Sequence, residues 1–551
     1  MRSILSVILL AIATLSYSQT PPSNYSMSPY SGPWTGEEAG HLLRRTLFGP
    51  TRPQILNSIA IGMDSTVEQL LVATPWTDFP LVYQDVDSNA AIGTSWVSAT
   101  YPPTNKGGVN DTRLRSLAAW KMKKMMEETS TITQKMDVFW HNHFAVSQPS
   151  DARTFYDYFE LIRSHTLGNF KTLVKEMTIQ PAMLQFLNGE DNVSNDPNEN
   201  YSRELLELYS IGKGIEIATG DYSRYTEQDV TEGARILTGY SNVGIRSETI
   251  ADPYSVFDPV KHDNTPKILS YHFGGATIMP NGITEYEDYI DTIFAQPDFA
   301  SFICESIYHF FVSNDITPTV QNQVISEMAN TLVSNNFEIR PVMLQLLKSQ
   351  HFYDVALRGC LMKSPMDFLF SIYNSIEAQV NFNQVSDYKI LYKIHYDARQ
   401  FGMNILEPPS VAGWPAYYQA PAFSRYWLSA VYLQKRYAMI DAKILGNGYN
   451  ADGNVFEIDG VSLLNTLTNP YDANAVLDDL FEIFLSIDVS QSDRTMLLDI
   501  LTDGLPIFEW TVLYNDYLLD PVTYGVDINN QITNTIAAIF KLYIFQTLLY
   551  E

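Results

Sequence analysis

Apolar residues recur every three or four positions along most of the chain, a spacing that places them on one face of an α-helix. The stretches with this spacing are 114–126, 132–144, 155–167, 201–211, 230–237, 289–311, 320–332, 341–347, 365–376 and 423–439. Alternating patterns are scarce, and only 245–250 and 267–273 favour short strands. We therefore predict a fold that is all-α or nearly so, a large multi-helix domain with long loops and at most a few short strands.

Capping residues predict where several of these helices begin. Thr35 and Glu38 have the spacing of a capping box, and Thr226 with Asp229 repeats it. Asp196 is followed by a proline, the combination preferred at an N-cap and in the first turn, so we predict that a helix starts there. These starts determine which polar side chains share a helix face.

Composition along the chain predicts its organisation. The segments are a signal peptide at 1–18, a flexible lead at 19–35, a main helical domain at 36–446 and a looser C-terminal helical part at 447–551, where Asn and Asp cluster with Gly. Long loops, of a length that is usually functional or disordered, lie at 74–111, 188–198, 241–285 and 402–421. Because no Gly/Ser/Pro linker divides the central blocks, we expect one large domain.

The first residues have the pattern of a secretory signal. Arg2 precedes an apolar run, 4–15, and small residues follow up to Ser18, so we predict cleavage near Ser18 and Gln19. The run is too short for a permanent membrane span, and an uncleaved N-terminal anchor is the alternative. We expect the mature chain to be secreted or periplasmic, with no transmembrane segment.

Charge and cysteine content narrow the classes of partner. The chain has 62 acidic and 35 basic residues, a formal net charge of −27. Such a surface repels nucleic acids, so we expect no nucleic-acid partner, whereas cations and neutral glycans are compatible with it. The two cysteines, Cys304 and Cys360, are compatible with a disulfide or with two buried thiols.

Two histidines are the first group of candidate functional residues in the sequence. His141 and His143 lie on the helix predicted at 132–144. Residues two apart on a helix point about 200° apart, so both imidazoles cannot bind one metal while the helix stays regular. At most one of them therefore faces a shared site, unless the helix ends here.

Carboxylate and guanidinium side chains are the second group of candidate functional residues. Glu199 and Arg203 are four residues apart and can pair along a helix, while Glu204 and Glu207 share a neighbouring face. This arrangement places two carboxylates beside a guanidinium group at the edge of the core. The polar residues that we expect to join the same pocket are Asp229, Arg235, His262 and Asp263.

Three hypotheses compete for this cluster. In an enzyme, His143, Glu204 and Glu207 supply acid–base groups for hydrolysis, or His141, His143 and Glu204 bind a divalent metal. In a binding protein, the carboxylates, Arg203 and nearby rings recognise a glycan or a partner protein. In a purely structural cluster, the Glu, Arg and His side chains pair with one another and lock helices together.

One loop carries a large ring on a rigid turn. The segment 406–415 contains prolines, Gly413 and Trp414. The indole of Trp414 is either an aromatic binding platform or a hydrophobic plug. The candidate binding residues are therefore Arg203, Asp229, Arg235, His262, Asp263 and Trp414.

With these residues in view, the chain resembles a bacterial family, domain of unknown function 1800 (DUF1800). The stretches that carry the resemblance are 41–45 with Phe48 and Gly49, 139–144, 198–207, 225–229 with 234–239, 262–263, 363–365 and 408–414. The chain departs from the family pattern at Met403, Ser410 and the pair Ala416-Tyr417. These departures fall in the predicted loop at 402–421.

The resemblance implies an exported, helix-rich protein and supplies no agreed catalytic residues. Family members are often encoded beside a second exported family that looks sulfatase-like, which implies such a partner and a joint role on extracellular polymers. We therefore predict an exported protein of unassigned activity, a binding or accessory component in extracellular polymer handling. The alternatives are a metal-assisted or acid–base hydrolase that uses the His/Glu/Arg cluster and a non-catalytic glycan-capture protein.

Overall fold

The computed structural model describes residues 21–376, 385–485 and 488–548. Helices dominate these residues, and their strands form only short two-stranded antiparallel sheets, which confirms the predicted fold class. The first half of the chain contains α2 (Gly36–Thr46), α3 (Arg52–Leu70), α4 (Lys106–Glu127), α5 (Thr133–Phe144), α6 (Ala152–Ser164), α7 (Phe170–Thr178), α8 (Pro181–Phe186), α9 (Asn200–Glu207) and α10 (Glu227–Ile236).

The later helices complete the body of the protein and form its C-terminal part. Those of the middle are α11 (Glu285–Phe294), α12 (Pro297–Phe311), α13 (Pro318–Val320), α14 (Ser326–Ser334), α15 (Ile339–Lys348), α16 (Pro365–Tyr373), α17 (Val385–Gln400) and α18 (Ala430–Met439), with short 3-10 turns η6 (Pro415–Tyr417) and η7 (Phe423–Leu428). Those of the C-terminal part are α19 (Gly460–Leu464), α20 (Ala473–Phe484), α21 (Gln491–Leu501), α22 (Ile507–Leu519), α23 (Pro521–Lys541) and α24 (Tyr543–Gln546).

The strands are short and mostly form local hairpins. They are β1 (Glu216–Ala218) with β2 (Asp221–Tyr222), β3 (Tyr240–Val243) with β4 (Tyr254–Phe257), β5 (Lys267–Ile268) with β6 (Thr277–Ile278), β8 (Tyr449–Ala451) with β9 (Asn454–Phe456), and β7 (Leu361–Met362) with β10 (Thr547–Leu548). The strand predicted at 245–250 is wrong, because this segment is the turn between β3 and β4, where Gly244 and Arg246 have positive φ. The β5 strand lies inside the predicted segment 267–273.

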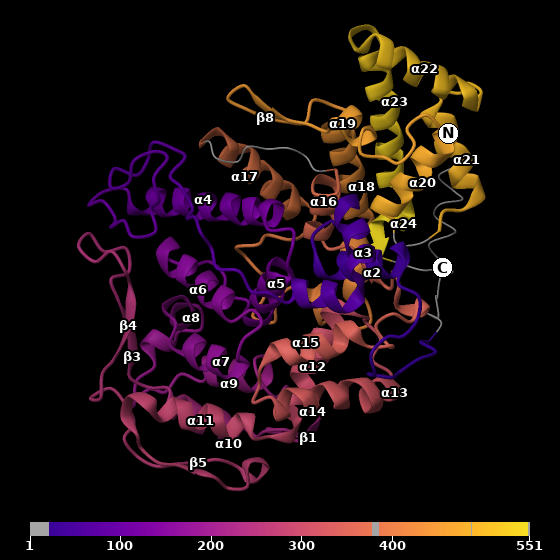
Figure 1. Ribbon diagram of the computed structural model, residues 1–551. Coiled ribbons are helices and arrows are strands. Elements are labelled where there is room, and N and C mark those ends of the chain that lie inside the picture. Colours follow the sequence, from indigo (N-terminus) through magenta and orange to yellow (C-terminus); the bar gives the residue numbers. More distant parts are fainter. Residues whose placement is uncertain (1–20, 377–384, 486–487, 549–551) are drawn as a thin grey trace.

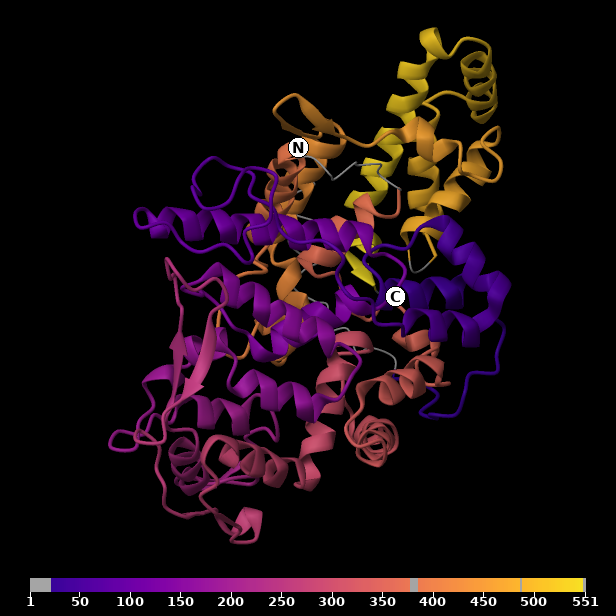
Figure 2. The same ribbon diagram turned by 60° about the vertical axis from the view of Figure 1, so that its left-hand side comes forward.

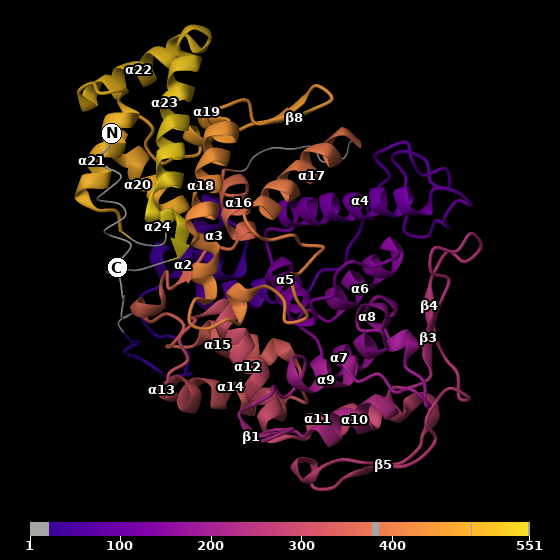
Figure 3. The same ribbon diagram turned by 180° about the vertical axis from the view of Figure 1, so that it is seen from behind.

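A continuous apolar core joins the helical layers. Figure 1 shows α4 and α17 side by side across the top of the body, α5 and α6 below them, and α10 and α11 along the opposite edge. Seen from behind, the β3–β4 hairpin covers the ends of α6 and α8 (Figure 3). The C-terminal helices stand beside α2 and α3 as a separate projection of the same chain (Figure 2).

Helix α5 lies at the centre of the molecule and is buried on nearly every side. Of its residues only Asn142 is partly exposed. The helix is confirmed almost as predicted, and both predicted capping boxes are present, at Thr35 with Glu38 and at Thr226 with Asp229. Polar side chains on α5 are therefore core residues and need partners within the protein.

The N-terminal predictions are only partly covered by the described residues. The predicted signal peptide, 1–18, lies outside them. The segment 21–35 runs against the end of α15, where the backbone N–H of Tyr30 donates to the Lys348 carbonyl, 2.7 Å away. None of the described helices combines the length and hydrophobicity needed to cross a bilayer. Cys304 and Cys360 are buried and are not joined by a disulfide.

Candidate functional site

The imidazole of His141 is enclosed in the core and uses both ring nitrogens. Nδ1 lies 2.9 Å from the Tyr158 hydroxyl oxygen, and Nε2 lies 2.6 Å from the Ile405 carbonyl oxygen. Since a carbonyl only accepts, Nε2 carries the proton and Nδ1 accepts from the tyrosine. Burial lowers the pKa of His141 to about 3, so the ring is neutral at physiological pH. It connects α5 to α6 and to the loop before η6.

His143 has different partners, as its position two residues along the helix requires. Its Nε2 lies 3.2 Å from the backbone oxygen of Tyr209, just after α9. Burial lowers its pKa to about 4. The Tyr209 hydroxyl in turn donates to the Phe144 carbonyl at 3.1 Å. This reciprocal pair of bonds joins the end of α5 to the end of α9.

The predicted metal set is not assembled. The two histidines point to separate neighbours, and both nitrogens of His141 are already hydrogen-bonded. Within the ranges that the structure describes, no group of three or more His, Cys, Asp or Glu side chains has an arrangement that could hold a metal ion. The proposal that His141, His143 and Glu204 ligate one divalent metal therefore lacks a geometric basis.

Glu204 and Glu207 do form a carboxylate pair on one face of α9. Partial burial, followed by the charge of Glu207, raises the pKa of Glu204 to about 6. Glu207 accepts from the Tyr225 hydroxyl at 3.0 Å and lies 3.4 Å from Lys213 Nζ. Two adjacent carboxylates with different environments are the arrangement that separates an acid from a base.

Arg203 is held between carboxylates on the same surface. It makes a bidentate ion pair with Glu227, both bonds 2.7 Å long, and a third bond of 3.0 Å to Glu199. The pairing with Glu199 was predicted from the sequence, but the helix start at Asp196 is wrong, since α9 begins at Asn200. The preceding residues adopt a turn, in which Asn192 Oδ1 accepts from the backbone N–H of Asn198 at 2.9 Å.

The remaining predicted residues pair in two buried or half-buried groups around α10. Arg235 donates to Asp263 at 2.7 Å and to Glu232 at 2.6 Å. Asp229, which is fully buried, caps α10 and accepts from the backbone and hydroxyl of Ser270 at 2.7 and 2.6 Å. These contacts hold the 258–270 loop against α10.

His262 belongs to the same loop but to a different buried group. Its Nε2 lies 2.9 Å from Glu285 Oε2, and Lys267 Nζ contacts the other oxygen of this carboxylate. The side chains of all three residues have no exposed surface. This group fastens the loop to the start of α11, so it meets the description of a structural ion pair.

Trp414 is a core residue and not a surface platform. Its side chain is 1% exposed, and its indole makes an edge contact with the His141 ring at a centroid distance of 5.6 Å. The backbone N–H of Trp414 donates to Asn142 Oδ1 at 2.9 Å, and a Cβ at Gly413 would lie 2.4 Å from the same oxygen. The plug alternative therefore describes this tryptophan.

One tyrosine that the sequence reasoning missed lies on the surface that carries Arg203 and the carboxylate pair. Tyr271 is 63% exposed, and its hydroxyl lies 3.1 and 3.0 Å from the two carboxylate oxygens of Asp221. Tyr222 donates to Glu227 at 3.3 Å and lies under the ammonium group of Lys213. We call this region the α9–α10 surface; its residues are Arg203, Glu204, Glu207, Lys213, Asp221, Tyr222, Glu227, Tyr271 and His272.

Comparison with known proteins identifies the family. A family model described as a protein of unknown function (DUF1800) matches residues 41–507, most of the chain. The chain belongs to this family. No curated protein and no solved structure matches it. The resemblance deduced from the motifs is thus confirmed, while the family supplies no activity that could be assigned to the residues above.

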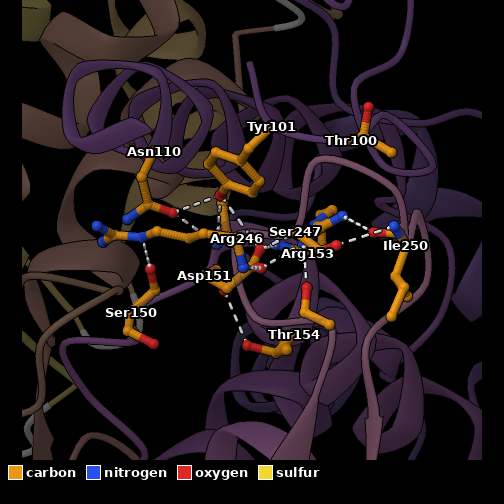
Figure 4. Close-up of polar contacts among 12 residues, drawn as sticks. Thr100, Tyr101, Asn110, Ser150, Asp151, Arg153, Thr154, Arg246, Ser247 and Ile250 are labelled. Carbon is orange, nitrogen blue, oxygen red and sulfur yellow. Dashed lines mark hydrogen bonds and ion pairs between the residues drawn. The ribbon is translucent and has the colours of Figure 1, made fainter. Parts of the chain in front are cut away.

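A second polar network was also missed from the sequence. Asp151, fully buried at the start of α6, accepts from Tyr101 at 3.1 Å and from the backbone N–H of Arg246 at 2.7 Å, and pairs with Arg153 at 2.6 Å (Figure 4). Arg153 also donates to the Ile250 carbonyl at 2.8 Å. Because its charges and donors are matched, this network anchors the β3–β4 turn and is not a ligand site.

Proposed function

We propose that this DUF1800 member is an exported binding or accessory component in extracellular polymer handling, and that it captures neutral glycan segments on the α9–α10 surface. The observation that carries the proposal is an exposed tyrosine ring beside hydrogen-bonded carboxylates. Tyr271 offers a flat apolar face, while Asp221 and Glu227 offer acceptors for sugar hydroxyls. The acidic net charge favours a neutral ligand over an anionic one at this surface.

The pairing within the surface supports recognition more than metal chemistry. Arg203 and Lys213 are held in place by Glu227 and Glu207, so the polar groups are preorganised before a ligand arrives. A preorganised surface loses little side-chain entropy on binding. These paired side chains hold one another in place, so their arrangement does not require a bound metal ion.

Binding of neutral polysaccharides and oligosaccharide arrays by the mature chain tests the proposal. Tyr271→Ala should weaken binding by about tenfold, the value of one stacked ring, and Asp221→Asn should weaken it as well. Tyr396→Ala is the matched control, because Tyr396 is 50% exposed on α17, outside this surface. Equal binding by all three variants, or no binding to any neutral glycan, would contradict the proposal.

A second candidate, an acid–base hydrolase, is favoured by the raised pKa of Glu204. With a pKa of about 6, this carboxyl is partly protonated near neutral pH and can donate a proton to a leaving group. Hydrolysis should then fall as the pH rises above about 6 and disappear in Glu204→Gln. Wild-type turnover that survives Glu204→Gln unchanged would exclude this role for Glu204.

Export and the sulfatase-like partner are part of the same proposal. Cleavage near Ser18 and Gln19 predicts a mature secreted or periplasmic chain that starts at Gln19, which N-terminal sequencing of the processed protein checks. A sulfatase-like partner predicts co-purification of the two proteins. A chain recovered with Met1 in place would favour the uncleaved anchor instead.

A further inference from the structure

Two adjoining cavities lie away from the α9–α10 surface, where α2, α5 and α16 meet η6 and η7. Both are lined by Arg44 and Asp367, which makes them neighbours. We call them together the α2–α16 cavity. Its larger part, about 30 Å³, is also lined by Arg45, Lys135 and Trp427, and its smaller part by Lys363. In Figure 1, α2 and α5 lie in the middle of the molecule and α16 lies above them.

The lining has an excess of positive charge. Four cationic side chains, Arg44, Arg45, Lys135 and Lys363, face a single carboxylate, Asp367. Arg45, Lys135 and Lys363 are at most 4% exposed. In a chain with 62 acidic and 35 basic residues, this local reversal of sign is unexpected. Buried cations are costly unless an anion compensates them.

Asp367, the single carboxylate of the lining, does not balance the charges of the four cationic side chains. Asp367 already contacts Lys135 Nζ and accepts from the Ser364 hydroxyl at 2.8 Å. Arg44 donates to the backbone oxygen of Glu482, whose carboxylate lies 3.5 Å from Arg52. Arg44, Arg45 and Lys363 form no ion pair with a carboxylate among the described residues, and the charges of Glu482 and Asp367 offset those of Arg44 and Lys363 only in part.

Several donors at the cavity also have no acceptor. Arg44 Nε, Arg45 Nη1 and Trp427 Nε1 are buried and have no hydrogen-bond partner among the described residues. Guanidinium and indole nitrogens donate only, so an acceptor is the single kind of group that satisfies them. Buried donors without partners are rare in folded proteins. The excess positive charge and the unpaired donors therefore both call for a ligand that is negatively charged and accepts hydrogen bonds.

Electrostatics within the cluster supports the same conclusion. Burial, then the charge of Arg44, lowers the pKa of Lys363 well below its usual range; the charge of Asp367 opposes this shift, while Arg436 and Lys135 add to it. The Lys363 ammonium group lies 3.5 Å from the centre of the Phe545 ring and 3.2 Å from the Ser371 hydroxyl. Neither neighbour carries a charge that could balance it.

We propose that the α2–α16 cavity binds a small oxyanion, sulfate or phosphate, either free or as the terminal group of a larger ligand. Its oxygens accept from Arg45 Nη1 and Trp427 Nε1 in the larger part of the cavity, while Lys363, which lines the adjoining smaller part, contributes positive charge. Guanidinium and ammonium groups together suit a tetrahedral oxyanion better than a monatomic ion. This site is independent of the glycan surface proposed above.

Isothermal titration of the full mature chain with sulfate and with inorganic phosphate, at constant ionic strength, tests the proposal. One saturable site is expected, with affinity reduced about tenfold or more in Lys363→Met. Lys389→Gln, which removes a surface cation paired with Asp452, is the matched control and should bind as the wild type does. Heats that do not saturate, or equal affinities in all three proteins, would overturn the proposal.

Thermal unfolding separates a ligand site from a structural role for Lys363. Without added oxyanion, Lys363→Met should unfold at the same or a higher temperature, because the variant loses a buried like-charge repulsion and keeps an apolar stem. Added sulfate should then raise its unfolding temperature less than that of the wild type. A variant that is less stable without sulfate and is stabilised equally by it would assign Lys363 a purely structural role and contradict the proposal.

The source of the oxyanion is distinguished by a third measurement. Crystals soaked in selenate should show an anomalous peak in the larger part of the cavity, beside Arg45 and Trp427, if free ions enter. A sulfated or phosphorylated oligosaccharide that competes with sulfate identifies a terminal group as the ligand. A selenate peak only on the outer surface, with no competition, would contradict the assignment to this cavity.

Discussion

The α9–α10 side of the molecule and the α2–α16 cavity use the same residue types in opposite ways. Around α10, Arg203, Arg235 and Lys267 each contact at least one carboxylate. At the cavity, several cations share one carboxylate and buried donors lack acceptors. A dense polar cluster whose charges are paired therefore indicates a ligand site only with a further feature, such as the exposed ring of Tyr271, whereas a buried cluster with unbalanced charge indicates one by itself.

The sequence motifs that suggest function occur in both regions, the α9–α10 surface and the α2–α16 cavity. The stretch 198–207 leads to the paired surface, while 41–45 and 363–365 meet at the cavity. Side chains that are already paired stabilise the fold or hold a surface in a fixed arrangement, whereas buried charges and donors without partners require a ligand to complete them.

The largest effect is expected where a buried pair is broken. Glu285→Ala should lower the free energy of unfolding by about 3–5 kcal/mol, since it leaves Lys267 buried beside His262 without its carboxylate. Urea denaturation measures this loss. Glu287→Ala, which removes a half-exposed partner of Lys175, should cost less than about 1 kcal/mol; similar losses in both variants would contradict the distinction.

A smaller but more specific effect is expected at the cavity. Asp367→Asn should lower the free energy of unfolding by about 2–3 kcal/mol, because a charged hydrogen bond with Lys135 is lost. Sulfate should stabilise this variant more than it stabilises the wild type, since it supplies the missing negative charge. Urea denaturation with and without sulfate checks both points, and an identical response to sulfate would count against an oxyanion site.

The pH dependence of stability should reflect the buried histidines. His143 has a folded pKa of about 4, so between pH 6.5 and 4 only the unfolded state binds the proton. Stability therefore falls as pH falls through this window, by about 1.4 kcal/mol per pH unit for this one group. Urea denaturation at pH 7, 6 and 5 should give a shallower slope for His143→Gln, whereas parallel slopes would mean that His143 has the same pKa in the folded and unfolded states.

The smallest effect is expected on the paired surface. Arg203→Gln should lower the free energy of unfolding by less than about 1 kcal/mol, because Arg203 and both of its carboxylate partners are partly exposed. Chemical denaturation is again the measurement. A loss above about 2 kcal/mol would show that this pair is as important for stability as the buried one at Glu285.

Local sequence signals predicted the fold well. The capping boxes at Thr35 and Thr226 and the helix at 132–144 follow from interactions within a few residues, and the structure has all three. The helix start at Asp196 failed because a turn held by Asn192 and Asn198 competes with the helix. The strand at 245–250 failed because residues with positive φ bend the chain there.

The sites were less predictable because their decisive partners are distant in sequence. The bond from Arg203 to Glu199 spans one helical turn and was predicted, but the bidentate pair with Glu227 was not. The cavity combines residues from four separate segments, at Arg44, Lys135, Lys363 and Trp427. Only the tertiary arrangement shows that these cations share one carboxylate, so no single motif could reveal it.

The decisive measurement is the affinity of the protein for sulfate, determined calorimetrically in the wild type, Lys363→Met and Lys389→Gln at one ionic strength. We expect one saturable site, which Lys389→Gln retains and whose affinity Lys363→Met lowers by about tenfold or more. Equal affinities in the three proteins, or no saturable binding in the wild type, would contradict the claim that unbalanced charge at the α2–α16 cavity is a ligand site.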